Sequence, residues 1–172
     1  MKKPLGFTIV EILIVCAVIG ILFTIVSAAW ALTIRDSEDD TRLAQQREWV
    51  SRFETYRAQH GVYPNSASAT NNSTPLNSRY CLGTDFPSNR CGNGIVATAV
   101  TSNRVLQELS KVGTLPEYTP KQVKGYAGPW VDYRFSDQIR VYQAYYNETC
   151  PTGTIKDTAY SGGVACYITL KK

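Results

Sequence analysis

The residue whose position is chemically least expected is Glu11, which lies inside an apolar stretch near the N-terminus. Residues 12–32 carry no charged side chain, and Lys2 and Lys3 precede the stretch. A carboxylate in such a segment is costly in lipid unless it is protonated or paired, so Glu11 is a candidate functional group. In lipid we expect this carboxylate either to take up a proton or to find a partner.

Few other residues are arranged for chemistry. The only histidine is His60, and the sequence has no Ser-His-Asp pattern, no paired carboxylates and no P-loop. Gly92-Asn93-Gly94 lacks the strand and helix patterns that surround a dinucleotide-binding turn. The net charge of +4 comes from basic residues scattered among acidic ones, which does not indicate nucleic-acid binding. We therefore expect no enzymatic activity, no cofactor and no specific nucleic-acid partner.

Five cysteines offer a second kind of chemistry. Cys16 lies in the apolar stretch, where it is most simply a small apolar residue. The other four are Cys81, Cys91, Cys150 and Cys166, and their even number indicates two disulfides. Three pairings are possible, and we favour Cys81–Cys91 with Cys150–Cys166 because both close short loops. The close cysteine pairs typical of a zinc site are absent, so we expect no metal.

The apolar stretch has the dimensions of a membrane span. Residues 12–32 would extend about 31 Å as a helix, at about 1.5 Å per residue, which matches a hydrocarbon core of about 30 Å. The basic start predicts that the N-terminus stays cytoplasmic and that the chain beyond Arg35 lies outside. Two alternatives remain. One is a secretory signal cleaved at Ala29-Trp30-Ala31, although the stretch is long for one, and the other is a plain anchor in which Glu11 snorkels.

The residues around Glu11 resemble a processing motif of a known protein family. Residues 6–15 read GFTIVEILIV, which resembles the class III leader junction of type IV pilins and pseudopilins. In that family, prepilin peptidase cuts after the glycine and N-methylates the new terminal residue. The resemblance implies that Gly6 is the cleavage glycine, Phe7 the methylated terminus and Glu11 the acidic fifth residue. It also implies that Glu11 of one subunit meets the Phe7 amine of a neighbour and sets the register of assembly.

The helical pattern continues beyond the span. Apolar residues recur at helical spacing on one face, and they are Leu43, Val50, Phe53 and Tyr56, with Trp49 beside them. Oppositely charged residues three or four apart are expected to pair on the other faces, and these pairs are Glu38–Arg42, Asp39–Arg42, Glu48–Arg52 and Glu54–Arg57. The pattern predicts one helix from Phe7 to about His60.

The predicted helix ends at Gly61-Val62-Tyr63-Pro64. Gly61 suits a left-handed cap, and Pro64 cannot continue a helix. This end also resembles that of pseudopilins and many pilins, in which an apolar residue and a tyrosine precede Gly-x-Tyr-Pro. The chain departs from the family at Ala28, where most pilins have a proline. Only Gly20 interrupts the span, so no sharp kink is predicted.

The rest of the chain predicts a small mixed domain. Residues 65–102 are rich in Asn, Ser, Thr and Ala, and residues 71–74 indicate an exposed loop. A short amphipathic helix follows, with Ser102 or Asn103 as its cap and Val105, Leu106, Leu109 and Val112 as its apolar side. Strands are expected over residues 131–135, around residues 139–141 after a turn at Ser136-Asp137, and over residues 164–170. The tyrosines concentrated there are expected in the core.

We thus predict an α+β fold, in which a long N-terminal helix packs against a small C-terminal antiparallel sheet. The predicted divisions are a leader (1–6), a transmembrane and filament-core helix (7–32), an extracytoplasmic helix (33–60) and a globular head (61–172). The resemblance implies a structural subunit of a type IV pilus or related filament. Its partners would be other pilins, prepilin peptidase, an assembly platform and the membrane.

The same resemblance implies an inner-membrane precursor and then an extracellular filament. Two alternatives stay open. One is a minor pseudopilin of a secretion or DNA-uptake machine, and the other is a membrane-anchored extracytoplasmic binding domain that never polymerises.

Overall fold

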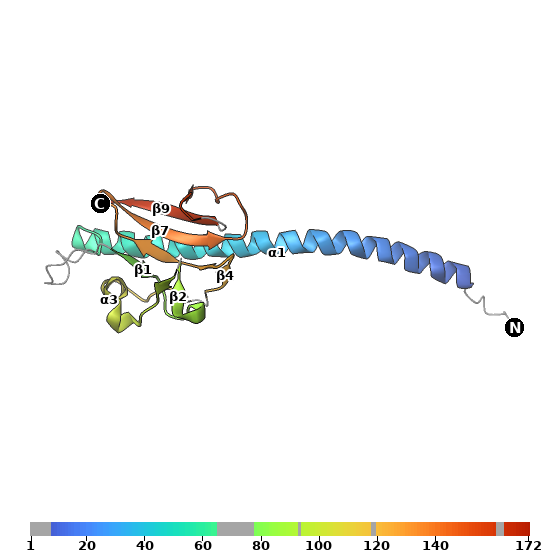
Figure 1. Cartoon of the computed structure of the whole chain (residues 1–172), viewed down its shortest axis with the longest axis horizontal. Coiled ribbons are helices and arrows are strands. Elements are labelled where there is room, and N and C mark those ends of the chain that lie inside the picture. The colour runs from blue at the N-terminus through green and yellow to red at the C-terminus, as the bar shows by residue number, and fades with distance from the viewer. Residues whose placement is uncertain (1–7, 65–77, 93, 118–119, 161–163) are drawn as a thin grey trace. The chain divides into compact units, whose positions relative to one another are not determined.

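The computed structural model describes residues 8–64, 78–92, 94–117, 120–160 and 164–172, without the side chains of residues 28, 29, 31, 32 and 164. The chain divides into two compact units, Met1–Ser37 and Glu38–Lys172. Helix α1, Ile9–His60, begins in the first unit and ends in the second (Figure 1). It is continuous through Gly20 and Ala28, in agreement with the absence of an encoded kink.

The C-terminal end of α1 has the predicted cap. Gly61 takes a positive φ of 77°, and its N–H donates to the carbonyl oxygen of Arg57 at 2.7 Å. This left-handed cap satisfies one of the carbonyls that a helix end leaves open. Two residues later the buried Tyr63 hydroxyl donates to Glu54 at 2.6 Å and accepts from Arg57 at 3.1 Å. The Gly-x-Tyr segment is therefore tied back to the last turns of its own helix.

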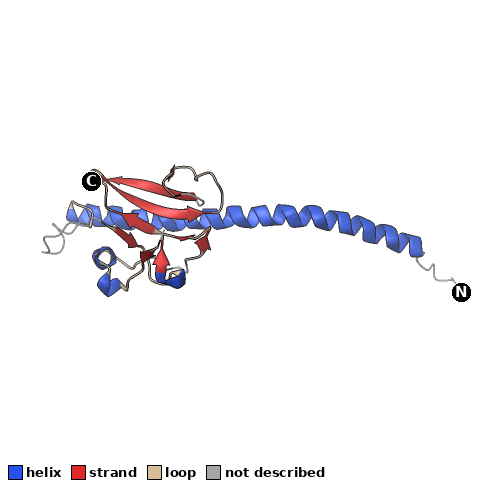
Figure 2. Cartoon of the chain, viewed as in Figure 1, coloured by secondary structure: helices blue, strands red, loops and turns tan. Residues whose placement is uncertain are grey.

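The second unit contains a five-stranded antiparallel sheet (Figure 2). Its strands, in spatial order, are β1 (Arg79–Cys81), β6 (Trp130–Asp132), β7 (Gln138–Tyr145), β9 (Val164–Lys171) and β8 (Ile155–Lys156). The central pair, β7 and β9, is in register from Gln138 opposite Lys171 to Tyr145 opposite Val164. The predicted α+β class with an antiparallel sheet is confirmed.

Smaller elements connect these strands. Two short antiparallel ladders pair β2 (Arg90–Cys91) with β3 (Ile95–Val96), and β4 (Gln122–Val123) with β5 (Tyr126–Ala127). Two 3₁₀ turns, η1 (Pro87–Asn89) and η2 (Val100–Ser102), precede helix α3 (Arg104–Ser110). Asn103 caps α3, because its side-chain oxygen accepts from the N–H groups of Val105 and Leu106. Of the two predicted caps, Asn103 is the one used.

Both faces of the sheet are covered, since alternate residues of a strand point to opposite sides. Ile139 and Val141 of β7 pack with the residues of α1. Tyr142 and Ala144 belong to a separate cluster around Trp130, which stacks on Tyr142 at 5.1 Å between ring centroids. The predicted α1 residues that are fully buried are Trp49, Phe53 and Tyr56. The strand tyrosines therefore serve mainly as core residues, as predicted.

The buried face of α1 also contains polar residues that the apolar pattern did not predict. Asp39, Arg42 and Gln46 continue the spacing of Trp49, Phe53 and Tyr56 toward the N-terminus, and all three are buried. The Gln46 side-chain amide donates to the carbonyls of Val141 (2.8 Å) and Cys166 (3.1 Å). Its oxygen accepts from the Tyr145 hydroxyl at 2.5 Å. These bonds satisfy polar groups that would otherwise be costly to bury.

The ion pairs predicted along α1 were wrong. Over residues 38–60, all of which the structure describes, none of the four pairs forms a salt bridge. Arg42 instead donates to the carbonyls of Ala144 and Lys121, and Glu38 pairs with Lys121 at 3.3 Å. Asp39 accepts the N–H groups of Tyr146 and Asn147 at 2.8 and 2.9 Å, so the sheet competes successfully for these charges.

Two strand assignments also need correction. Phe135 was predicted in a strand, but β6 ends at Asp132, whose carboxylate accepts from the Arg134 backbone N–H and guanidinium and ends the ladder there. No strand was predicted within residues 65–102, yet β1, β2 and β3 lie in that range. β1 forms because Tyr80 pairs with Val131 at a sheet edge, a contact distant in sequence. Residues 71–74 lie outside the described residues.

Candidate functional site

Glu11 lies in the first turn of α1, where Thr8 is the residue before the helix. The Thr8 backbone N–H and hydroxyl both donate to Oε2 of Glu11 at 2.8 Å. In return, the Glu11 backbone N–H lies 3.3 Å from the Thr8 hydroxyl oxygen, which accepts it. This reciprocal arrangement is a capping box, which satisfies backbone donors that a helix start leaves open. Thr8 is thus a site residue that the sequence reasoning missed, although Thr-x-x-Glu before an apolar run is a recognisable signal.

The capping box leaves half of the carboxylate open. Both bonds go to Oε2, and Oε1 has no hydrogen-bond partner within the described residues. Glu11 is exposed, and so is the surface of the turn that it occupies. A carboxylate oriented by one oxygen and open at the other can accept a hydrogen bond from an ammonium group without losing its own helix cap.

The helix surface around Glu11 is apolar and uncovered. Ile9–Ser27 has a mean hydropathy of 3.0 and is long and apolar enough to cross a membrane. Its large apolar side chains are at least half exposed from one end to the other, including Leu13 (63%), Ile19 (59%) and Phe23 (72%). Isolated apolar side chains at a protein surface are ordinary, but a continuous apolar surface marks contact with lipid or with another protein.

The predicted processing residues, Gly6 and Phe7, lie outside the described residues. The described part begins at Thr8, immediately after Phe7, so the structure fixes only the Thr8–Glu11 side of the proposed contact. Cleavage at Gly6, methylation of Phe7 and the register role of Glu11 remain predictions.

The four cysteines of the second unit form two disulfides, in the pairing that the loop lengths favoured. Cys81 is bonded to Cys91 and Cys150 to Cys166, with Cα–Cα distances of 5.6 and 5.8 Å. Cys16 is a free thiol on the exposed part of α1. The first disulfide joins the edge strand β1 to β2, and the second ties the chain after β7 to β9. Both disulfides therefore hold segments next to the sheet in place and are not part of a reactive site.

Tyrosines and the histidine in the described part of the second unit contribute to packing. Burial raises the pKa of Tyr133 and of Tyr145 well above the usual value for a phenol, so both are neutral at physiological pH. His60 stacks on Tyr56 at 4.1 Å and lies 3.1 Å from its backbone carbonyl oxygen. Over the described ranges, no group of three or more His, Cys, Asp or Glu side chains is placed to hold a metal ion.

Comparison with known proteins gives one finding. Residues 1–27 match the family model of the prokaryotic N-terminal methylation motif. The chain therefore carries the class III signal of type IV pilins and pseudopilins, with Gly6, Phe7 and Glu11 inside the matched region. The comparisons with curated proteins and with solved structures gave no match.

Proposed function

We propose that this chain is a structural subunit of a type IV pilus or related filament. The observation that carries the proposal is the methylation motif at residues 1–27, which covers Glu11 and most of the exposed apolar helix. Prepilin peptidase removes residues 1–6 and methylates Phe7, while residues 7–32 stay attached as the membrane anchor. The head enters the extracytoplasmic space, and the anchor later moves from lipid into the core of the filament.

The open carboxylate suggests how subunits would be aligned. Cleavage before Phe7 creates an ammonium group next to Thr8, the residue that orients Glu11. The Phe7 amine of an arriving subunit binds Oε1 of Glu11 in its neighbour, while Oε2 keeps the capping box. A buried ion pair contributes little net stability but penalises every register in which one charge is left alone. The pair thus selects a single register for helices whose apolar surfaces alone would slide.

The test is the mature N-terminus of the protein in filaments. The full chain is produced in cells that make prepilin peptidase, filaments are sheared off, and the N-terminal peptide is identified by mass spectrometry. We expect a peptide that begins with N-methylated Phe7. A Gly6→Glu variant should accumulate uncut in the membrane and be absent from the sheared fraction.

Two other outcomes identify the alternatives. A mature chain that begins at Leu32 would indicate an ordinary signal peptide cleaved after Ala31 and would overturn the proposal. A correctly cut and methylated chain that stays in the membrane at wild-type level and never enters filaments would indicate an anchored, non-polymerising domain.

A further inference from the structure

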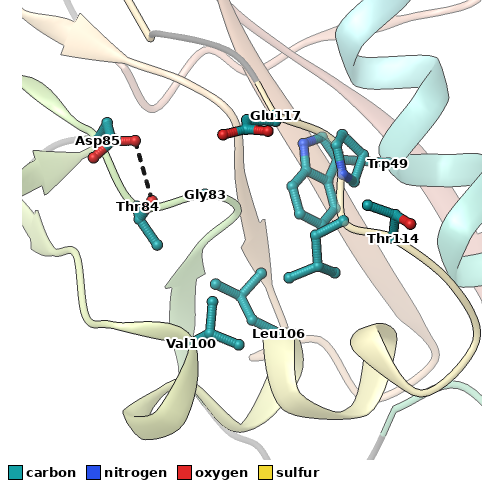
Figure 3. Close-up of a pocket in the computed structure, with 10 residues that line it drawn as sticks. Trp49, Gly83, Thr84, Asp85, Val100, Leu106, Thr114 and Glu117 are labelled. Carbon is teal, nitrogen blue, oxygen red and sulfur yellow. Dashed lines mark hydrogen bonds between the residues drawn. The ribbon is translucent and has the colours of Figure 1, made fainter.

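The second unit has a pocket of about 320 Å³ that the proposed function does not use. Its apolar surface comes from three elements, with Trp49 of α1, Val100 of η2 and Leu106 of α3 (Figure 3). Two loops form its sides. One contains Gly83, Thr84 and Asp85, and the other contains Thr114, Leu115, Pro116 and Glu117. The volume lies at the lower end of the range for ligand-binding pockets.

The loops around the pocket are anchored to the core. The Cys81–Cys91 disulfide closes the chain segment that contains Thr84 and Asp85. Asn103 caps α3 and also donates from its side-chain amide to the Cys81 carbonyl at 2.9 Å, which ties α3 to the end of β1. A site that is held before its ligand arrives loses less entropy on binding.

The helix below the pocket has a second anchor. Glu108 of α3 is buried and accepts a hydrogen bond from Tyr56 of α1 at 2.9 Å. It also pairs with Lys111 at 2.7 Å. α3 is therefore fixed to both α1 and β1, and the pocket has a defined shape.

The charged residues that line the described pocket are both acidic. Asp85 and Glu117 lie on the two opposing loops and are both exposed (Figure 3). Asp85 accepts a hydrogen bond from Thr84 at 3.3 Å, and no lysine or arginine lines the described pocket. Residues 38–172 hold 15 of the 18 Lys and Arg residues and 12 of the 14 Asp and Glu residues, a formal net charge of +3. An acidic pocket on a basic unit is complementary to another copy of that unit.

The second unit also exposes a lysine, Lys124, at a position outside the pocket. β4 and β5 form a hairpin whose two turn residues, Lys124 and Gly125, both have positive φ, at 46° and 88°. Positive φ at both positions is the signature of a tight type I′ turn. The flanking Val123 and Tyr126 are buried, whereas Lys124 and Gly125 are exposed. The hairpin therefore exposes Lys124 at its tip.

Lys124 does not contribute to the pocket of its own chain. Arg42 binds the carbonyl of Lys121 just before the hairpin, whereas Tyr56 binds α3 beside the pocket. These two attachment points are separated by 14 residues of α1, or about 21 Å at about 1.5 Å per residue. A contact between hairpin and pocket is thus heterologous, and such contacts propagate into open helical assemblies when the rotation between copies does not close.

We propose that the Lys124 hairpin of one copy docks in the acidic pocket of the next copy. The four-carbon stem of Lys124 packs along Val100 and Leu115, the apolar lining residues that are partly exposed, and its ammonium lies between Asp85 and Glu117. Lysine is suited to this pocket because it combines an apolar stem with a terminal charge. This inference rests on the proposed filament, since the contact requires many copies held side by side.

The test is charge reversal in the full chain, measured as the amount of subunit in sheared filaments. We expect Lys124→Glu alone, and Asp85→Lys with Glu117→Lys alone, each to reduce filaments roughly tenfold, because like charges then oppose each other at the contact. All three changes in one chain should restore most of the loss. Lys171→Glu and Asp137→Lys each reverse one charge of the same kind at another exposed position and should have little effect.

A second measurement identifies the contact directly. A zero-length carbodiimide crosslinker applied to wild-type filaments should give dimers in which Lys124 is joined to Asp85 or Glu117. The docking inference is overturned if the triple variant is no better than its parents, or if the crosslinked dimers join other residues. If the wild-type chain is absent from filaments altogether, the proposed function fails instead, and that result is visible before any variant is made.

Discussion

The apolar part of α1, Ile9–Ser27, and its later part, Asp39–His60, differ in which side chains they bury. The first part exposes isoleucine, leucine and phenylalanine side chains along its length. The second part buries a carboxylate, a guanidinium and an amide beside Trp49 and Phe53. One continuous helix is therefore apolar where none of the described residues covers it and partly polar where the sheet covers it.

The difference lies in where each part finds its partners. Asp39, Arg42 and Gln46 find theirs in the sheet of the same chain, through the hydrogen bonds of one carboxylate, one guanidinium and one amide. Within the described residues, the side chains of the apolar part make only local hydrogen bonds, such as those of Glu11 with Thr8 and of Thr24 with the Ile21 carbonyl. Its apolar surface must be covered by lipid or by other helices, because water is a poor solvent for it. Changes in the first part should therefore affect assembly, and changes in the second should affect the stability of the single chain.

The largest effect is expected for Glu11→Leu. Removing a carboxylate from the apolar segment should leave membrane insertion at least as efficient as in the parent. Filament assembly should be abolished, because the Phe7 amine of the neighbour loses its partner. The measurement is the subunit content of membranes and of sheared filaments, for parent and variant side by side.

A matched variant shows whether charge is the cause. Glu11→Gln keeps the size of the side chain and an oxygen for the Thr8 capping box, but it has no negative charge. It should fail to assemble like Glu11→Leu. Normal filaments from Glu11→Gln would show that the register does not depend on an ion pair.

The next effect is expected in the second unit, for Cys150→Ser. Closing a loop of about 15 residues contributes about 3 kcal/mol in the chain-entropy account of disulfides, and Cys150 and Cys166 are separated by 16 residues. The full chain in detergent should unfold at a lower denaturant concentration. Cys166 should react with an alkylating reagent only after unfolding, because its side chain is fully buried.

Cys16→Ser is the matched control for this change. It removes the free thiol of the exposed helix and should leave the denaturant midpoint unchanged. An equal loss of stability in both variants would contradict the division between the two parts. Release of Cys91 rather than Cys166 in the Cys150→Ser protein would contradict the disulfide pairing.

A smaller loss of stability is expected for Gln46→Leu. Leucine fits the volume but leaves the Tyr145 hydroxyl without its acceptor and the carbonyls of Val141 and Cys166 without the Gln46 amide. Leaving buried polar groups in this way costs about 2 kcal/mol. The adjacent Gln45 is only half-buried, so Gln45→Leu is the control. Equal denaturant midpoints for the two variants would mean that the Gln46 network is not stabilising.

The sequence predicted what depends on local pattern. The N-terminal leader junction, the helix end at Gly61 and the cap at Asn103 are all encoded by residues next to one another, and the structure has both caps. The disulfide pairing followed from loop length. The predictions that failed concern contacts between residues that are distant in the sequence. The charges at Asp39 and Arg42 fit helical ion pairs equally well, and only the folded sheet, more than 100 residues away, determines that they bind its backbone instead.

The same limit explains the missed strand and the missed pocket. β1 has no clear alternation and exists because β6 pairs with it. The pocket combines α1, η2 and α3 with two loops, and no spacing in the sequence brings Asp85 and Glu117 to opposite sides of it. Conversely, the Thr8–Glu11 capping box is local and could have been predicted from the Thr-x-x-Glu spacing. Glu11 was interpreted only as a carboxylate in a membrane span and not also as part of a helix cap.

The smallest effect is expected for Thr8→Val, which separates these two roles of Glu11. Valine has nearly the shape of threonine and keeps the backbone N–H that donates to Oε2, but its side chain can neither donate to the carboxylate nor accept the Glu11 N–H, so the helix start should lose about 1 kcal/mol. Amide hydrogen exchange in the first turn should then be roughly fivefold faster in detergent. Thr8→Ser keeps the hydroxyl and should exchange like the parent. Because Oε1 of Glu11 stays open to a neighbour's amine, Thr8→Val should still assemble filaments, with a modest reduction. If Thr8→Val instead abolishes assembly as completely as Glu11→Leu, the capping box itself is what the neighbour recognises, and the division of labour between the two carboxylate oxygens is wrong.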